Sequence, residues 1–193
     1  MTKNILIVGV GGQGTLLTGR IIGNHAMTKG LDVKMSEVHG MAQRGGSVVM
    51  QVRYGEKVHS PLVELGDVDI IFAFEKLEAL RYLPYLKKDG VMIVNTQEID
   101  PMPVVMGVQP YPQDIIETLK ASSHQNCFID ALSIAEEIGN VKVVNMIMIG
   151  AYAAYIGDSV SEWETIVEQT VPAKTIEMNK EALRRGYKAY QEK

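Results

Sequence analysis

The chain has 193 residues, of which 46% are hydrophobic and 22% charged, and its formal net charge is −4. This length predicts a single domain, residues 1–193, with a sizeable hydrophobic core. The single cysteine, Cys127, excludes an internal disulfide framework, and it excludes an iron–sulfur cluster held by this chain alone, because such a cluster needs several thiolate ligands. The acidic balance argues against a nucleic-acid partner.

The expected compartment is the cytoplasm. Residues 1–4 lead directly into an aliphatic run, which does not match a secretion signal. The longest apolar stretch, residues 143–156, falls short of the roughly 20 residues needed to span a bilayer. We therefore expect no membrane partner.

The first half of the chain alternates between expected strands and helices. Continuous aliphatic runs predict buried strands, because a parallel strand covered on both faces is apolar throughout. Apolar side chains at helical spacing predict helices between these runs. The expected strands are 5–8, 32–37, 47–54, 69–74 and 91–94, and the expected helices are 15–29 and 75–83.

The second half predicts an irregular connection followed by mostly helical structure. Pro101, Pro103, Pro110 and Pro112 mark the connection, with a short extended piece expected at 104–108. Further expected elements are helices at 115–121, 131–138 and 144–155, a strand at 127–129, and an amphipathic helix at 174–189. The pattern predicts an α/β fold: a Rossmann-like, doubly wound, mostly parallel sheet with helices on both faces and a C-terminal amphipathic helix.

A glycine-rich loop follows the first expected strand. Residues 9–14, Gly-Val-Gly-Gly-Gln-Gly, fit the pattern G-x-G-x-x-G between a buried strand and a helix. Free N–H groups at the start of that helix, with the helix dipole behind them, favour a phosphate or another anion. The alternative is that these glycines only allow the helix to pack closely on the sheet.

One interpretation of this loop is a dinucleotide-binding site. A self-sufficient NAD- or FAD-binding domain would use Gly9, Gly11 and Gly14, with Glu37 at the end of the second strand holding the ribose. The residues after Glu37 argue against it, because a simple ribose site does not need the guanidinium of Arg44 or the imidazole of His39.

Arg44 stands directly before the pair Gly45-Gly46. Its planar fork of donors suits a bidentate anion, and the two glycines let the backbone come close. The alternative is a surface charge on a flexible loop.

No catalytic residue and no metal site is predicted in this chain. The motifs of serine hydrolases, zinc proteases and P-loop enzymes are absent from the sequence. His25, His59 and His124 have no carboxylate or cysteine partners at metal-ligand spacing.

Four segments together carry a resemblance that extends over nearly the whole chain. They are residues 9–14, 37–47 (Glu-Val-His-Gly-Met-Ala-Gln-Arg-Gly-Gly-Ser), 74–81 (Phe-Glu-Lys-Leu-Glu-Ala-Leu-Arg) and 145–151 (Asn-Met-Ile-Met-Ile-Gly-Ala). The combination resembles the beta subunits of indolepyruvate ferredoxin oxidoreductases, within the gamma subunit or domain family of the 2-oxoacid:ferredoxin oxidoreductases.

The resemblance implies a subunit of an oxidoreductase complex. A large partner subunit would hold thiamine diphosphate and iron–sulfur clusters, and the complex would convert aryl pyruvates such as indolepyruvate to acyl-CoA with coenzyme A and ferredoxin. This chain would hold no cofactor and would be inactive alone. The resemblance implies a supporting, cofactor-binding role without catalysis for Gly11, Gly12, Gln13, Gly14, Arg44, Gly45 and Gly46.

Overall fold

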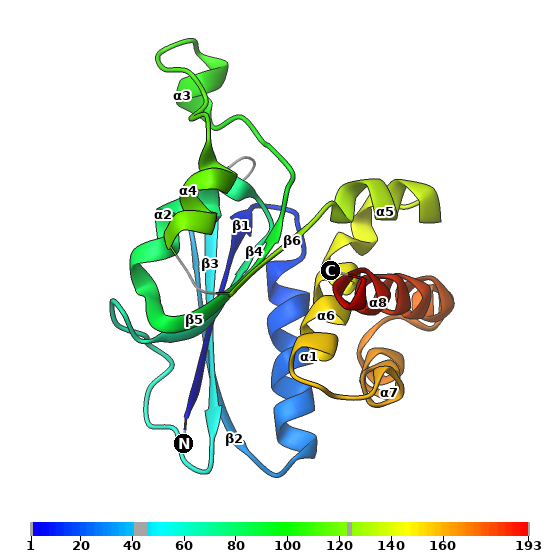
Figure 1. Cartoon of the computed structure of the whole chain (residues 1–193). Coiled ribbons are helices and arrows are strands. Elements are labelled where there is room, and N and C mark those ends of the chain that lie inside the picture. The colour runs from blue at the N-terminus through cyan, green and yellow to red at the C-terminus, as the bar shows by residue number, and fades with distance from the viewer. Residues whose placement is uncertain (1, 41–45, 123–124, 193) are drawn as a thin grey trace.

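The computed structural model describes residues 2–40, 46–122 and 125–192, which form a six-stranded sheet with helices on both faces (Figure 1). The strand order is β2-β3-β1-β4-β5-β6. The strands are β1 (Lys3–Val10), β2 (Asp32–His39), β3 (Ser47–Gly55), β4 (Val68–Ala73), β5 (Leu86–Asn95) and β6 (Gln125–Ile129).

The sheet is mostly parallel, as predicted, with one reversed strand. β1, β4, β5 and β6 pair in parallel, for example with Ile5 opposite Ile70. β3 lies antiparallel between β1 and β2, with Ile5 opposite Val52. The strand that follows the first helix is therefore not a neighbour of β1.

Helices cover each face of the sheet and enclose a separate hydrophobic cluster. α1 (Thr15–Thr28), α5 (Ala131–Ile138), α6 (Val144–Tyr155), α7 (Val160–Thr170) and α8 (Ile176–Gln191) lie on one face, and α2 (Lys76–Tyr82) and α4 (Ile115–Ser122) on the other (Figure 1). Successive side chains of β1 point to opposite faces of the sheet. Ile5 and Ile7 belong to the cluster under α1 and α6, and Leu6 and Val8 belong to the cluster under α2 and α4. This explains why the strand is apolar throughout.

The short elements complete the description. They are α3 (Met102–Val105), η1 (Leu83–Tyr85), η2 (Val141–Val143) and η3 (Ala173–Thr175). No described helix is long and apolar enough to cross a membrane.

Two expectations about the second half of the chain need correction. The extended piece expected at 104–108 is wrong, because residues Met102–Val105 form α3, which carries Pro103 in its first turn. Proline is tolerated there, since the first N–H groups of a helix have no intrahelical partner. The structure also contains α7, which was not predicted, although Trp163, Ile166 and Val167 are buried at helical spacing.

Candidate functional site

The glycine loop connects β1 to α1 at the carboxyl end of the strand. Gly12 and Gly14 have φ angles of 99° and 85°, a left-handed backbone that glycine adopts without strain. Gly14 is the N-cap of α1 and no described side chain caps the helix; the first intrahelical bond runs from Thr18 N to Gly14 O, 3.0 Å. The N–H groups of the first turn therefore point toward the space beyond the helix end, where an anion is favoured.

Gln13 holds this loop onto the sheet. Its Oε1 accepts a hydrogen bond from Val10 N at 2.7 Å, and its Nε2 donates to Phe74 O at 3.0 Å and to Gln97 Oε1 at 3.2 Å. The side-chain amide of Gln13 is thus engaged within the protein. These hydrogen bonds fix the shape of the loop.

A buried asparagine extends the same network to the next strand. Asn95, at the end of β5, is fully buried, and its Nδ2 donates to Phe74 O at 3.0 Å and to Gln97 Oε1 at 3.2 Å. Its Oδ1 accepts from Ala131 N at 3.1 Å. Side-chain amides therefore join the carboxyl ends of β1, β4 and β5. Asn95 was not identified as a site residue from the sequence, although a polar residue directly after the buried run 91–94 was a possible signal.

A pocket of about 430 Å³ opens beside the loop. It is lined by Gly11, Gly12, Gln13, Gln97, Leu132, Val141, Lys142 and Val144. The glycine loop, apolar residues and one cationic residue, Lys142, thus line one space. This combination suits an anionic ligand that also carries an apolar part.

Lys142 and Asn145 were not identified as site residues from the sequence. A Cβ atom on Gly14 would lie 3.0 Å from Asn145 Nδ2, so α6 packs directly against the start of α1. Asn145 is 2% exposed, and its Oδ1 has no hydrogen-bond partner among the described residues. No spacing pattern in the sequence could reveal these neighbours, because only the folded chain brings them to the loop.

The segment 37–47 is described only at its ends. Arg44 and Gly45 lie outside the described residues. Gly46 O accepts a hydrogen bond from Gly11 N at 3.1 Å, and Ser47 Oγ donates to Glu78 Oε2 at 2.5 Å. The carboxyl-terminal end of this segment is therefore attached to the glycine loop and to α2.

Two buried glutamates support α2 next to the site. Glu75 is 1% exposed and caps the helix by accepting from Glu78 N at 3.0 Å, and it also accepts from the hydroxyl of Tyr111. Burial raises the pKa of Glu78, against the opposing effects of Ser47 and Arg81. These contacts assign both carboxylates to holding α2 against Ser47 and Tyr111.

Glu37 lies two strands away from the glycine loop, too far to complete a dinucleotide site with it. It pairs with Met50 of β3, and β3 separates β2 from β1. Neighbouring strands lie about 4.8 Å apart, so Glu37 is roughly 9.6 Å from the strand that carries the loop. The NAD- or FAD-binding alternative therefore finds no support.

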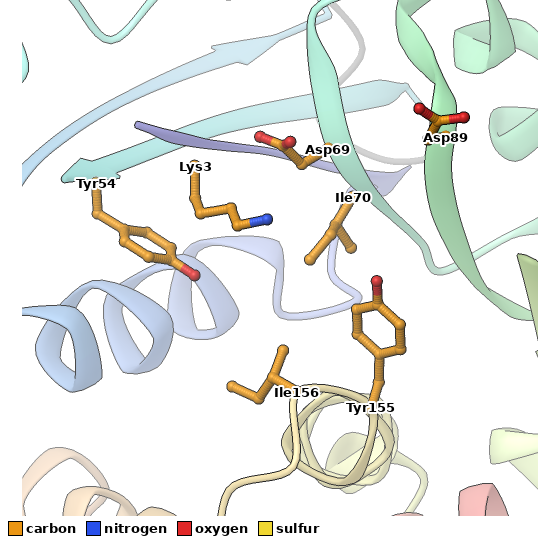
Figure 2. Close-up of a pocket in the computed structure, with 7 residues that line it drawn as sticks. All are labelled: Lys3, Tyr54, Asp69, Ile70, Asp89, Tyr155 and Ile156. Carbon is orange, nitrogen blue, oxygen red and sulfur yellow. The ribbon is translucent and has the colours of Figure 1, made fainter. Parts of the chain in front are cut away.

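A second pocket, of about 360 Å³, lies at the opposite end of the sheet (Figure 2). Lys3, Asp69, Asp89 and the hydroxyl of Tyr155 line it (Figure 2). Asp69 already accepts from Asn4 N at 2.8 Å and from Lys87 Nζ at 3.0 Å. Ligands of open α/β sheets bind at the carboxyl ends of the strands, so the pocket beside the glycine loop is the better candidate.

Comparison with known proteins gives consistent results over the whole chain. A family model described as pyruvate ferredoxin/flavodoxin oxidoreductase matches residues 4–189. The chain is 41% identical over 194 residues to indolepyruvate oxidoreductase subunit IorB of Thermococcus kodakarensis, an alignment that covers 98% of this chain and 96% of that protein.

Solved structures share the fold. The keto/oxoacid ferredoxin oxidoreductase gamma subunit from Geobacter sulfurreducens superposes with a TM-score of 0.74 at 23% identity, covering 99% of each chain. The 2-oxoglutarate:ferredoxin oxidoreductase from Magnetococcus marinus, solved with 2-oxoglutarate, coenzyme A and succinyl-CoA bound, matches with a TM-score of 0.74 at 18% identity. The match covers 100% of this chain but 31% of that one, so the fold also occurs as part of a larger polypeptide.

Proposed function

Because the chain belongs to the pyruvate ferredoxin/flavodoxin oxidoreductase family, we propose that it is the small subunit of an indolepyruvate ferredoxin oxidoreductase. The observation that carries this proposal is the 41% identity to an indolepyruvate oxidoreductase subunit over 98% of the chain. Residues 1–193 would then form one gamma-type domain.

The proposed complex oxidises an aryl pyruvate. The 2-oxoacid loses carbon dioxide and a pair of electrons, its acyl group forms a thioester with the sulfur of coenzyme A, and the electrons pass to ferredoxin. Thiamine diphosphate and iron–sulfur clusters, which would supply the redox chemistry, would be held by the large partner subunit. The one cysteine of this chain, Cys127, is buried, which agrees with that division of roles.

The pocket beside the glycine loop is the proposed contribution of this chain to the site. Backbone N–H groups at the start of α1 and the ammonium of Lys142 would hold a phosphate group of coenzyme A, and the apolar wall would contact its uncharged part. Gln13 shapes the loop, and Arg44 would add a bidentate contact to an anion. The supporting residues are therefore Gly11, Gly12, Gln13, Gly14, Arg44, Gly45 and Gly46, together with Lys142.

The experiment is to co-express this chain, carrying an affinity tag, with the large subunit encoded in the same genome. We expect the two to co-purify and to reduce ferredoxin only when indolepyruvate and coenzyme A are both present. Pyruvate and 2-oxoglutarate serve as comparison substrates. A complex that forms but turns over one of these faster than indolepyruvate would reject the assigned substrate, and failure to co-purify would reject the assigned partner.

A further inference from the structure

Three potential metal ligands from distant parts of the sequence meet on the helical side of the molecule, away from the glycine loop pocket. His25 lies in the last turn of α1, Asp158 precedes the N-cap residue of α7, and Glu162 lies in the first turn of α7. One ligand atom from each residue falls within 4.8 Å of the other two. No metal site at His25 is expected from the sequence, because neither carboxylate is near it in the chain.

The imidazole of His25 is held by stacking, and its Nε2 faces the carboxylate of Asp158. The residue is 9% exposed, and its ring stacks on Trp163 with centroids 4.0 Å apart and planes at 21°. Its Nε2 lies 2.9 Å from Asp158 Oδ2, yet it has no hydrogen-bond partner among the described residues, so the nitrogen is not aligned with that oxygen. The contact with Asp158 is an ion pair when the imidazole is protonated. When the imidazole is neutral, the same nitrogen and carboxylate can act together as metal ligands, which is a common role of neutral imidazole.

Asp158 is held in place from several sides. Its Oδ2 accepts a hydrogen bond from Trp163 Nε1 at 3.2 Å, and its main-chain oxygen accepts from the hydroxyl of Tyr187 at 3.1 Å. Its N–H donates to Ala153 O at 3.1 Å. A carboxylate oriented by an outer hydrogen-bond donor is the usual arrangement around a bound metal ion.

We propose that His25, Asp158 and Glu162 bind a divalent transition-metal ion, with Zn²⁺ as the best match to one imidazole and two carboxylates. A pocket of about 310 Å³, lined in part by His25, Thr28, Glu162 and Gln169, adjoins the cluster and provides a route for entry and room for a bound water. The ion would connect the end of α1 to the start of α7.

The geometry requires one side chain to move. Zinc bonds of about 2.0–2.2 Å place tetrahedral ligand atoms about 3.4 Å apart, so a separation near the 4.8 Å limit must shrink by up to about 1.4 Å. Glu162 can supply this movement, because its side chain is exposed on the helix surface. Lys29 opposes binding, since its Nζ lies 3.4 Å from both carboxylate oxygens of Glu162 and would have to turn away.

Trp163 gives a local readout of the site. It is the only tryptophan of the chain and it stacks on His25, so a paramagnetic ion at the cluster should quench its fluorescence. The full chain is first treated with a chelator and desalted. Co²⁺ is then titrated while fluorescence is recorded, and Zn²⁺ binding is measured by calorimetry and by competition against Co²⁺. We expect one ion per chain with each metal.

Variants on α7 separate the proposed site from general surface binding. Glu162→Gln should weaken Zn²⁺ affinity about tenfold or more. Glu168→Gln is the matched control, because Glu168 is also an exposed glutamate of α7 paired with a lysine, Lys180, and it should leave affinity unchanged. Lys29→Met should strengthen binding. His25→Gln should abolish binding; because it lies in the packed interface, its fold is checked by circular dichroism.

Some results would overturn the proposal. Absence of stoichiometric Zn²⁺ binding by the wild-type chain would do so, as would binding without any change in Trp163 fluorescence on Co²⁺ addition. Equal losses in Glu162→Gln and Glu168→Gln would assign the ion to nonspecific surface carboxylates. These measurements do not use enzymatic activity, so they stand apart from the test of the complex.

Discussion

Lys142 is the one charged residue among the described residues that line the pocket beside the glycine loop. In the assembled complex, Lys142→Met should raise the KM for coenzyme A about fivefold, because an exposed charge contributes roughly 1 kcal/mol to binding. Methionine keeps the length and apolar stem of the side chain, so the melting temperature should not change. Lys174→Met, at an exposed lysine away from the pocket, is the control. An unchanged KM in Lys142→Met would remove the lysine from the ligand site.

The raised pKa of Glu78 predicts that its contribution to folding stability decreases as the pH rises. Burial raises the pKa of Glu78 in the folded chain, so the folded state holds this proton more firmly than the unfolded state does. The resulting contribution to stability is complete below the unfolded value of 4.5, and it is lost as the pH rises through the raised folded pKa. Glu78→Gln keeps an acceptor for Ser47 and removes the charge.

The stability of Glu78→Gln relative to the wild type should therefore increase from pH 4 to pH 7 (roughly the range in which carboxyl groups titrate). Urea unfolding at several pH values measures this difference. Glu56→Gln removes an exposed charge and serves as the control, for which we expect a nearly constant difference. A difference for Glu78→Gln that falls with pH would show that Arg81 and Ser47 outweigh the burial.

The loop between β1 and α1 provides a test at the level of an element. Gly12 and Gly30 have φ angles of 99° and 77°, and a Cβ atom on either would meet nothing within 4 Å. Substitution by alanine should cost both about 1–2 kcal/mol of folding stability, the strain of a left-handed backbone. Because only Gly12 of the two lines the pocket, only Gly12→Ala should weaken coenzyme A binding as well.

The comparison of these two variants decides between the interpretations of the loop. Unfolding by urea measures the stability of each, and the KM of the complex for coenzyme A measures binding. If both variants lose stability and neither changes the KM, the glycines serve only the turn and the packing of α1.

The crossing of α6 and α8 gives a second prediction at this scale. A Cβ atom on Gly186 would lie 1.9 Å from Ile147 O, which is main chain and cannot turn aside. Gly186→Ala should therefore destabilise the chain by about 3 kcal/mol or more, the upper range for overpacking. Gly23→Ala in α1 is the matched control, because its Cβ would meet the flexible Met35 side chain and helix propensity favours alanine. Similar melting temperatures for the two variants would show that the helices separate without cost.

Local patterns explain which elements were predictable. The aliphatic run of β1 and the glycines after it lie within one short segment, so both the strand and the turn into α1 could be predicted from the sequence. The place of β3 beside β1 could not, because pairing between strands depends on contacts across the whole sheet. β2 and β3 form an antiparallel pair and are connected by residues 40–46. Because β3 lies next to β1, Glu37 on β2 is one strand further from the glycine loop.

At the scale of the whole molecule, the polar lining of the pocket comes from three separate parts of the chain. The glycine loop supplies backbone groups, Gln97 follows β5, and Lys142 precedes α6. The first of these was identified from the sequence, because its motif is continuous. The other two are joined to it only by the fold, and an isolated lysine or glutamine carries no signal of its own in the sequence. Arg44 stays a prediction, since it lies outside the described residues.

The last prediction concerns the chain without its partner. The purified chain should contain no iron–sulfur cluster, because Cys127 is its one cysteine and is buried in the core. We also expect it to contain no thiamine diphosphate and to show no turnover of indolepyruvate, because the proposed large subunit would hold that cofactor. Iron and sulfide analysis, mass spectrometry of released cofactors and a ferredoxin reduction assay test this directly. Addition of the large subunit should restore the reaction, and the rate should saturate with the concentration of this chain. Turnover by the chain alone would contradict a division in which the partner holds the redox cofactors, whereas a large subunit that is fully active by itself would leave this chain without a part in the reaction.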